Sequence, residues 1–267
     1  MGFLVTLHEY SALPIAQRLS THLFRWTADQ MLFTSDKEMT HYGRSRVMQR
    51  VIHIGSNVPA FFSTRKRVPT VIYFGQIRPG KGLEEYLELA SRSLQLGKPF
   101  KYQVIGSVPE RRVDYYRAVR ETSLPEVEWL IDLPREQVAE RMASSLAAYL
   151  PFPDGASYRR GSLIATLTSG LPTMTTVGPA TPWEMIDVVL ATTGPTQALA
   201  HLERLYELPG EAHALSCAAA SFAEKFSWAQ IAEQHARVYE NVLHGIQDSR
   251  QFTKRYKDSL FPGPGGV

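Results

Sequence analysis

Short apolar segments alternate with amphipathic segments along most of the chain. Apolar runs rich in β-branched and aromatic residues predict strands at 3–8, 30–35, 51–55, 70–75, 101–107, 127–132, 146–152 and 171–176. Helical spacing predicts helices at 12–26, 36–43, 82–96, 109–122, 134–144, 161–169, 195–207, 210–225 and 227–245. Continuous apolar strands that alternate with helices favour an α/β fold, a doubly wound parallel sheet covered on both faces.

A domain boundary is expected in the segment 59–70, which carries two prolines and a basic run between two predicted strands. We therefore expect four parts. These are a partial N-terminal domain at 1–66, a larger domain at 67–226, a C-terminal helix at 227–247 that packs back toward the N-terminal part, and a tail at 248–267. The tail ends in "FPGPGGV", a composition typical of disorder.

Composition narrows the class of protein. The 267 residues carry a formal charge of +3, from 29 basic and 26 acidic side chains, which is too small to indicate a nucleic-acid partner. The single cysteine, Cys217, excludes an internal disulfide framework and fits a reducing compartment. No apolar run approaches the roughly 18 residues of a membrane span. These features predict a cytoplasmic protein.

The segment 74–90, "FGQIRPGKGLEEYLELA", predicts an anion site. A strand ends at Gly75, and a helix follows whose free backbone N–H groups attract negative charge, with Gln76, Arg78 and Lys81 in the loop between. The loop matches a P-loop only in part, because Gly82 stands where Mg²⁺ binding needs Ser or Thr. A phosphate or diphosphate is the expected ligand, and the alternative is a pair of solvated turn residues.

A second candidate site lies at 151–172, "PFPDGASYRRGSLIATLTSGLP". Asp154 and Arg160 precede a predicted helix, Gly161 allows close approach, and Ser162 is expected to cap that helix. An arginine at a helix N-terminus binds anions or hydroxyl groups. The alternative is an ordinary helix cap beside a solvated arginine pair.

Several motifs together resemble a known family. The segment 74–90, then "KYQVIGS", "VEWLIDLPREQVAERMASS", "AAYLPFPDGASYRRGSLIATLTSGLPTMTT" and "FSWAQIAEQHARVYENVL", are similar to the donor-binding half of retaining, family-four-like GT-B glycosyltransferases. The resemblance covers roughly 70–245 and extends more loosely to "LHEYS" and "VIHIG". It implies a GT-B-like fold with an incomplete N-terminal Rossmann-like domain. It also implies transfer of a sugar, with retention, from a nucleoside-diphosphate sugar to a glycan or lipid-linked acceptor, without a bound metal or other cofactor.

The resemblance also implies roles for particular residues. Arg78 and Lys81 take the position of the basic pair that grips the donor diphosphate, and the segment 154–162 takes that of the nucleotide-sugar loop. His8 is the candidate for the histidine that reaches the reacting sugar or the acceptor. The alternative for His8 is an ordinary histidine at a strand end.

Two features depart from the family pattern. Ser157 and Ala165 stand where the family usually carries a pair of glutamates, so recognition of the nucleotide is in doubt. The front end is also short, with about 65 residues before the expected boundary. An open apolar sheet edge is therefore expected. Either a partner chain or a second copy covers this edge, or the chain is a shortened gene product, and the lone chain is expected to bind a nucleotide or nucleotide sugar but to transfer poorly.

Three readings follow from this. The first is a glycosyltransferase, the second a weak or inactive GT-B homologue that serves as a subunit or binding module, and the third a phosphosugar epimerase on the same architecture.

The segment 12–26 carries Leu19, Leu23, Phe24 and Trp26 beside arginines, which favours peripheral contact with the inner membrane face. An ordinary core face with a solvated rim is the alternative for that segment.

Overall fold

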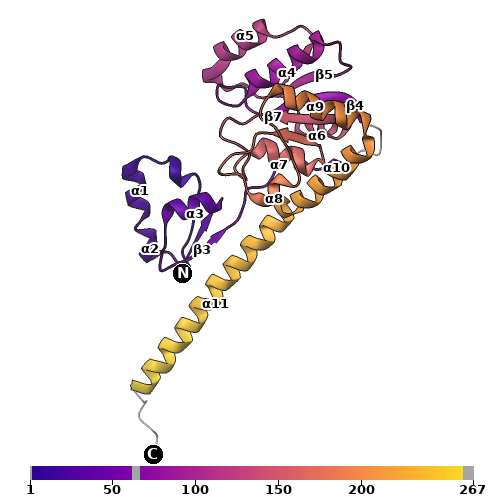
Figure 1. Cartoon of the computed structure of the whole chain (residues 1–267). Helices are drawn as coiled ribbons and strands as arrows, with labels where there is room; N and C mark the ends of the chain where they lie inside the picture. The colour runs from indigo at the N-terminus through magenta and orange to yellow at the C-terminus, as the bar shows by residue number, and fades with distance from the viewer. Residues whose placement is uncertain (1, 62–66, 261–267) are drawn as a thin grey trace, which may run out of the picture. The chain divides into compact units, whose positions relative to one another are not determined.

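The computed structural model describes residues 2–61 and 67–260 (Figure 1). The chain divides into two compact units, Met1–Ile54 with Trp228–Val267, and Gly55–Ser227. The first division falls between Ile54 and Gly55, whereas the sequence predicts a boundary at 66/67.

The N-terminal unit contains a small parallel sheet of order β1-β2-β3. Its elements are β1 (Leu4–Leu7), a 3-10 turn (Tyr10–Ala12), α1 (Ile15–Thr21), α2 (Phe24–Thr27), β2 (Gln30–Phe33), α3 (Asp36–Tyr42), β3 (Met48–Val51) and α11 (Trp228–Leu260). The central strand β2 is buried along its whole length. Two elements differ from expectation, since the helix expected at 12–26 is split into α1 and α2, and β3 lies before the expected strand at 51–55.

Helix α11 belongs to this unit through its first turns. Ile231 and Val238 of α11 form a buried cluster with Leu32 of β2 and with Ile52. The helix continues through Leu260, so residues 248–260 are helical rather than part of the expected tail, and the remainder of that tail lies outside the described residues. In the described part of the chain, no helix is both long enough and apolar enough to cross a membrane.

The second unit contains a six-stranded sheet of order β6-β5-β4-β7-β8-β9 in which every pairing is parallel. The strands are β4 (Val68–Phe74), β5 (Lys101–Gly106), β6 (Val127–Ile131), β7 (Ser145–Leu150), β8 (Thr173–Thr175) and β9 (Leu190–Ala191). The helices are α4 (Leu83–Gln95), α5 (Val113–Thr122), α6 (Arg135–Ser144), α7 (Gly161–Thr168), α8 (Trp183–Ile186), α9 (Pro195–Glu207) and α10 (Pro209–Ala223). The expected doubly wound α/β architecture is confirmed in this unit.

The order of the strands determines where a ligand would bind. Right-handed crossovers place α4 and α5 on one face of the sheet and α6 and α7 on the other. Helix α9 returns beside α4, and α10 packs on α7 (Figure 1). The strand order reverses between the neighbours β4 and β7, and ligands of open α/β sheets collect at the carboxyl ends of strands at such a point.

Arg67, just before β4, joins four parts of the second unit. Its guanidinium donates to the carbonyl oxygens of Met142 (3.2 Å), Ser145 (2.9 Å) and Gly170 (2.7 Å), and to the hydroxyl of Ser216 (3.1 Å). Burial removes water from the Arg67 guanidinium and lowers its pKa below the usual value. The four acceptors replace the hydrogen bonds that water would otherwise provide. The arginine thereby connects α6, the start of β7, the turn before β8 and α10 to the start of β4.

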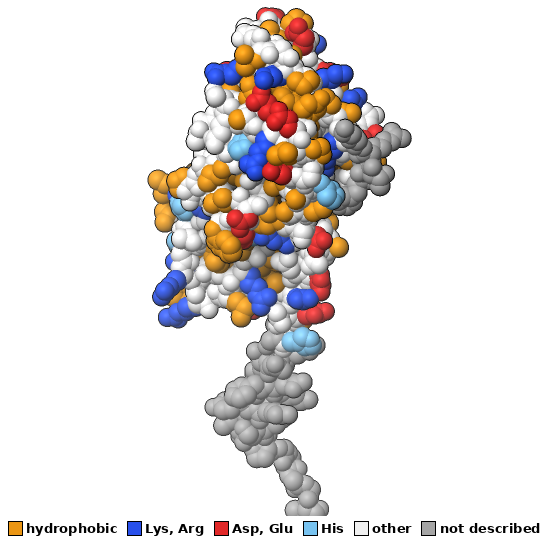
Figure 2. Space-filling view, turned by 45° about the vertical axis from the view of Figure 1, so that its right-hand side comes forward, with side chains coloured by type: hydrophobic (Ala, Val, Ile, Leu, Met, Phe, Trp, Pro, Cys, Tyr) orange, Lys and Arg blue, Asp and Glu red, His pale blue; other side chains and the backbone are white. Residues whose placement is uncertain are grey.

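Figure 2 shows how charge is distributed over one face of the molecule. Basic and acidic side chains are interspersed with apolar ones there, and neither sign of charge covers a continuous surface of this face. This mixed surface agrees with the small net charge of +3.

Candidate functional site

The loop after β4 forms the first half of the site. The N–H of Gly75 donates to the carbonyl oxygen of Ile105 (3.1 Å), and that of Ile77 donates to Ser107 (2.9 Å), so the loop is fixed to the end of β5. Within the loop, Ile77 is fully buried, Gln76 is exposed, and Arg78 and Lys81 are partly exposed. Gly82 precedes α4 in a left-handed conformation (φ 78°), and no side chain caps the helix. The first N–H groups of α4 are therefore available to an anion.

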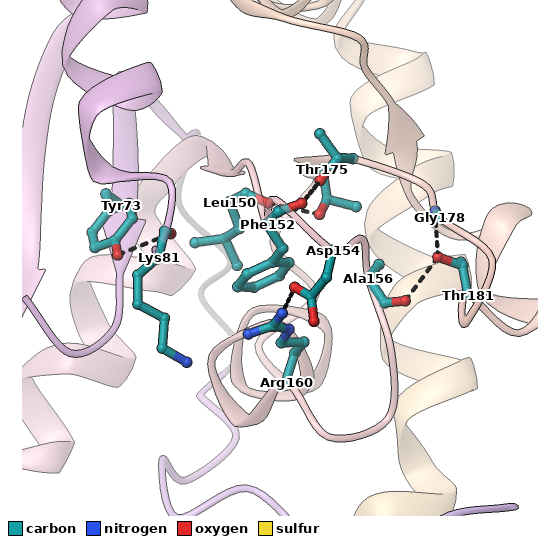
Figure 3. A network of polar contacts seen from close by, with 11 residues as sticks. Tyr73, Lys81, Leu150, Phe152, Asp154, Ala156, Arg160, Thr175, Gly178 and Thr181 are labelled. Atoms are coloured by element: carbon teal, nitrogen blue, oxygen red, sulfur yellow. Dashed lines mark hydrogen bonds and ion pairs between the residues drawn. The ribbon is translucent and has the colours of Figure 1, made fainter. Parts of the chain in front are cut away.

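The loop after β7 forms the second half. Thr181 accepts a hydrogen bond from the N–H of Gly178 (2.9 Å) and donates one to the carbonyl oxygen of Ala156 (2.7 Å) (Figure 3). Thr176 donates to the carbonyl oxygen of Phe152. These bonds fix the segment 152–156 to the loop after β8. Arg160 follows this fixed segment, at the N-terminus of α7. Helix α7 also begins without a side-chain cap.

The structure brings the two halves together. A Cβ atom built on Gly75 would lie 3.9 Å from both Cβ and Oγ of Ser162, and 3.7 Å from the hydroxyl of Tyr73. The hydroxyl of Tyr73 donates to the carbonyl oxygen of Lys81 (3.2 Å), and Figure 3 shows Lys81 and Arg160 on the same side of this junction. We refer to the loops 75–82 and 151–162 together as the β4–β7 junction.

Electrostatics at the junction favour an anion. Burial raises the pKa of Tyr73 well above its usual value, the Glu84 charge adds to the rise, and Arg78 and Arg160 oppose it. Burial lowers the pKa of Arg160, and the neighbouring charge of Arg78 lowers it further. Arg78 and Arg160 therefore lie close enough to repel each other, and an anion between them would relieve that repulsion.

Comparison of sequences alone gives no assignment. No family model matches the sequence, and no curated protein matches it. Comparison of structures, in contrast, identifies the fold. A glycosyltransferase from Rickettsia africae ESF-5 has a TM-score of 0.70 at 13% identity, over 90% of this chain and 70% of that one. Anabaena HepE in complex with UDP and glucose has a TM-score of 0.69 at 14% identity, over 90% of this chain and 71% of that one. This chain has the GT-B glycosyltransferase fold.

Other structures of the GT-B fold are longer than this chain. It spans 47% of a chain of the GtfA/B complex (85% of this chain, TM-score 0.60, 14% identity) and 50% of TarM (90% of this chain, TM-score 0.67, 10% identity). The low identities establish the fold alone, so activity is argued below from this chain's own residues.

One expected residue role in this GT-B chain is wrong. Ser162 does not cap α7, because the helix begins at Gly161 and Arg160 occupies the capping position. The Ser162 hydroxyl instead lies near Gly75. A Cβ built on Gly161 would meet no atom within 4 Å, so no part of the described chain needs glycine there.

The remaining candidates stay predictions. His8 is exposed and belongs to the N-terminal unit, whereas Arg78, Lys81, Asp154 and Arg160 belong to the second. Among the described residues, no group of three or more His, Cys, Asp or Glu side chains is placed to hold a metal ion.

Sequence reasoning missed two aromatic residues of the junction. Tyr73 is the penultimate residue of β4 and its hydroxyl lies near Gly75, and the Phe152 ring lies under the Arg160 guanidinium, 4.6 Å from ring centre to Cζ. Both occur in apolar stretches at or just after the end of a strand, where only packing distinguishes a site residue from a core residue. The sequence therefore offered no signal for either.

Proposed function

We propose that the chain is a glycosyltransferase that takes its sugar from a nucleoside-diphosphate sugar. The observation that supports this most strongly is the close approach of the two loops at Gly75 and Ser162, which brings basic side chains of both loops and two uncapped helix N-termini to the β4–β7 junction. A diphosphate is the ligand whose charge matches this arrangement. The UDP named with HepE, on the same fold, makes UDP the first nucleotide to test.

The same arrangement would promote transfer. Negative charge on the diphosphate grows as the bond from sugar to phosphate breaks, and fixed cations and N–H groups stabilise that state more than the ground state. Arg78, Lys81 and Arg160 would thus hold the leaving group without a metal or other cofactor. The Asp154 carboxylate would accept a sugar hydroxyl, and His8 would face the acceptor. We further propose retention, in which the departing phosphate deprotonates the acceptor hydroxyl on the same sugar face.

Nucleotide titration followed by a hydrolysis assay tests the proposal. We expect calorimetry to detect binding of UDP, ADP or GDP, and we expect the corresponding glucose donor to be hydrolysed slowly when acceptor is absent. Absence of binding for all three nucleotides would contradict a donor site at the junction. Glucose is the first sugar to test because HepE has been crystallised with UDP and glucose.

A second function is favoured by one observation at α7. Ala165, at the position of the family's ribose-binding glutamate, is almost completely buried in the core, so it offers no group to a ribose. A nucleotide-binding subunit without transferase activity would fit this, and the GtfA/B complex shows that this fold occurs in assemblies. Nucleotide binding without hydrolysis or transfer by the isolated chain would support the subunit role.

The acceptor is proposed to be a glycan or a lipid-linked sugar, with peripheral contact of the N-terminal unit with a membrane. Ile15, Leu19, Leu23 and Trp26 recur at helical spacing along α1 and α2 and are exposed, and Arg46 lies 4.7 Å from the Trp26 ring centre. We expect the protein to sediment with vesicles that contain phosphatidylglycerol, and Leu19→Ser with Leu23→Ser to reduce that fraction several-fold. Equal sedimentation of wild type and variant would refute this contact.

A further inference from the structure

Asp154 and Arg160 form an ion pair at the β4–β7 junction (Figure 3). The two partners differ in environment. The Arg160 side chain is 14% exposed and stacks on the Phe152 ring, whereas the Asp154 side chain is 77% exposed. The cation is therefore held in place by packing, and the anion can leave for solvent at little cost.

The position of the pair places it in competition with a bound donor. Arg160 immediately precedes the uncapped N-terminus of α7, and it feels the charge of Arg78 from the opposite loop. A diphosphate between these groups would have to contact the guanidinium that Asp154 now occupies. One guanidinium can contact two anions, but a second anion so close to a carboxylate would be repelled.

We propose that Asp154 is an exchangeable counter-ion for Arg160, which it releases to the donor diphosphate when the nucleotide sugar binds. The inference rests on the proposed function and adds to it the order of events at the site. In the donor-free chain the carboxylate balances a largely buried charge next to Arg78. In the complex the phosphate takes over that task, and the released carboxylate becomes available to a hydroxyl group of the sugar.

The alternative is a permanent pair that only shapes the loop. Under that alternative the diphosphate is held by Arg78 and Lys81, and Asp154 and Arg160 remain joined. The two cases differ in what happens when Asp154 loses its charge. An exchangeable counter-ion competes with the ligand, so its removal tightens binding, whereas loss of a loop-shaping pair disorders the loop and weakens binding.

The experiment is a double-mutant cycle with UDP as the probe, read by calorimetry. We expect Asp154→Asn to tighten UDP binding about fivefold, as removal of one part-exposed competing anion would do. In an Arg160→Gln background we expect the same substitution to change the affinity less than twofold, because the cation for which the two anions compete is absent. Asp154→Ser provides a second neutral variant, and thermal unfolding of each variant verifies the fold.

Glu84→Gln is the matched control for a general electrostatic effect. Glu84 is another exposed carboxylate of the same region, since its charge raises the pKa of Tyr73. Its carboxylate accepts a hydrogen bond from the Tyr115 hydroxyl (2.6 Å), whereas that of Asp154 pairs with an arginine. We expect this control to tighten binding clearly less than Asp154→Asn. Unchanged or weaker binding in both Asp154 variants would overturn the exchange, as would an equal gain with Arg160→Gln or with Glu84→Gln. If the wild type binds UDP while the exchange fails, the proposed function stands, whereas absence of all nucleotide binding refutes both.

Discussion

Replacement of both Arg78 and Lys81 by alanine is expected to weaken UDP binding by a factor of about 100 or more. A hydrogen bond from a charged donor to a phosphate contributes about 1.5–3 kcal/mol, so two of them contribute roughly 3–6 kcal/mol. The junction retains Arg160 and the N–H groups of α4 and α7, so some affinity should remain. Calorimetric titration of both proteins with UDP gives the ratio directly.

Two cations at the other end of α4 provide the control. Arg92, in the last turn of α4, and Lys98, just beyond the helix, pair with Glu88 and Glu203 at the end remote from the junction. Arg92→Ala with Lys98→Ala changes the net charge by the same amount and is expected to alter the affinity less than threefold. An equal loss in both double variants would show that only net charge matters, and an unchanged affinity without Arg78 and Lys81 would refute the diphosphate site.

The middle of the six-stranded sheet was predictable because its strands are buried on both faces. Burial of all six residues of β7 requires a continuous apolar run, and that run is visible in the sequence. The edge of the N-terminal sheet was not predictable in this way. Strand β3 alternates exposed and half-buried positions, including Met48 and Arg50, and pairing with β2 rather than hydropathy selects it. The apolar Ile52 follows the strand and packs on α11 instead.

In the candidate site, too, features that are local in the sequence could be predicted, whereas contacts between distant segments could not. Gly75, Arg78 and Arg160 are candidates from the sequence because a glycine, a basic residue and a helix start lie close together there. The contact of Gly75 with Ser162 was not predictable, because it depends on β4 and β7 being neighbours although α4, β5, α5, β6 and α6 separate them. Helix α7 also begins two residues earlier than a cap at Ser162 would require, so local capping rules misplaced Ser162.

Gly82→Ala is expected to destabilise the second unit by about 3 kcal/mol or more and to abolish high-affinity nucleotide binding. Two effects add. Gly82 has a φ of 78°, a conformation that costs alanine about 1–2 kcal/mol. Its new Cβ would also lie 1.9 Å from the carbonyl oxygen of Pro151, a backbone atom that cannot rotate away. The loops after β4 and β7 would have to separate at the β4–β7 junction. Urea unfolding followed by far-ultraviolet circular dichroism measures the first effect, and titration with UDP measures the second.

Gly80→Ala separates strain from collision. Gly80 lies two residues earlier in the same loop with nearly the same φ, 73°, but a Cβ there would meet no atom within 4 Å. This control therefore has only the conformational cost of about 1–2 kcal/mol and should leave UDP affinity within a few-fold of the wild type. The difference between the two variants is the free-energy cost of the collision between the new Cβ and Pro151, at the point where the two halves of the junction approach most closely. If both variants lost the same stability and bound UDP equally well, the close approach of Gly82 to Pro151 would not be what aligns Arg78 with Arg160.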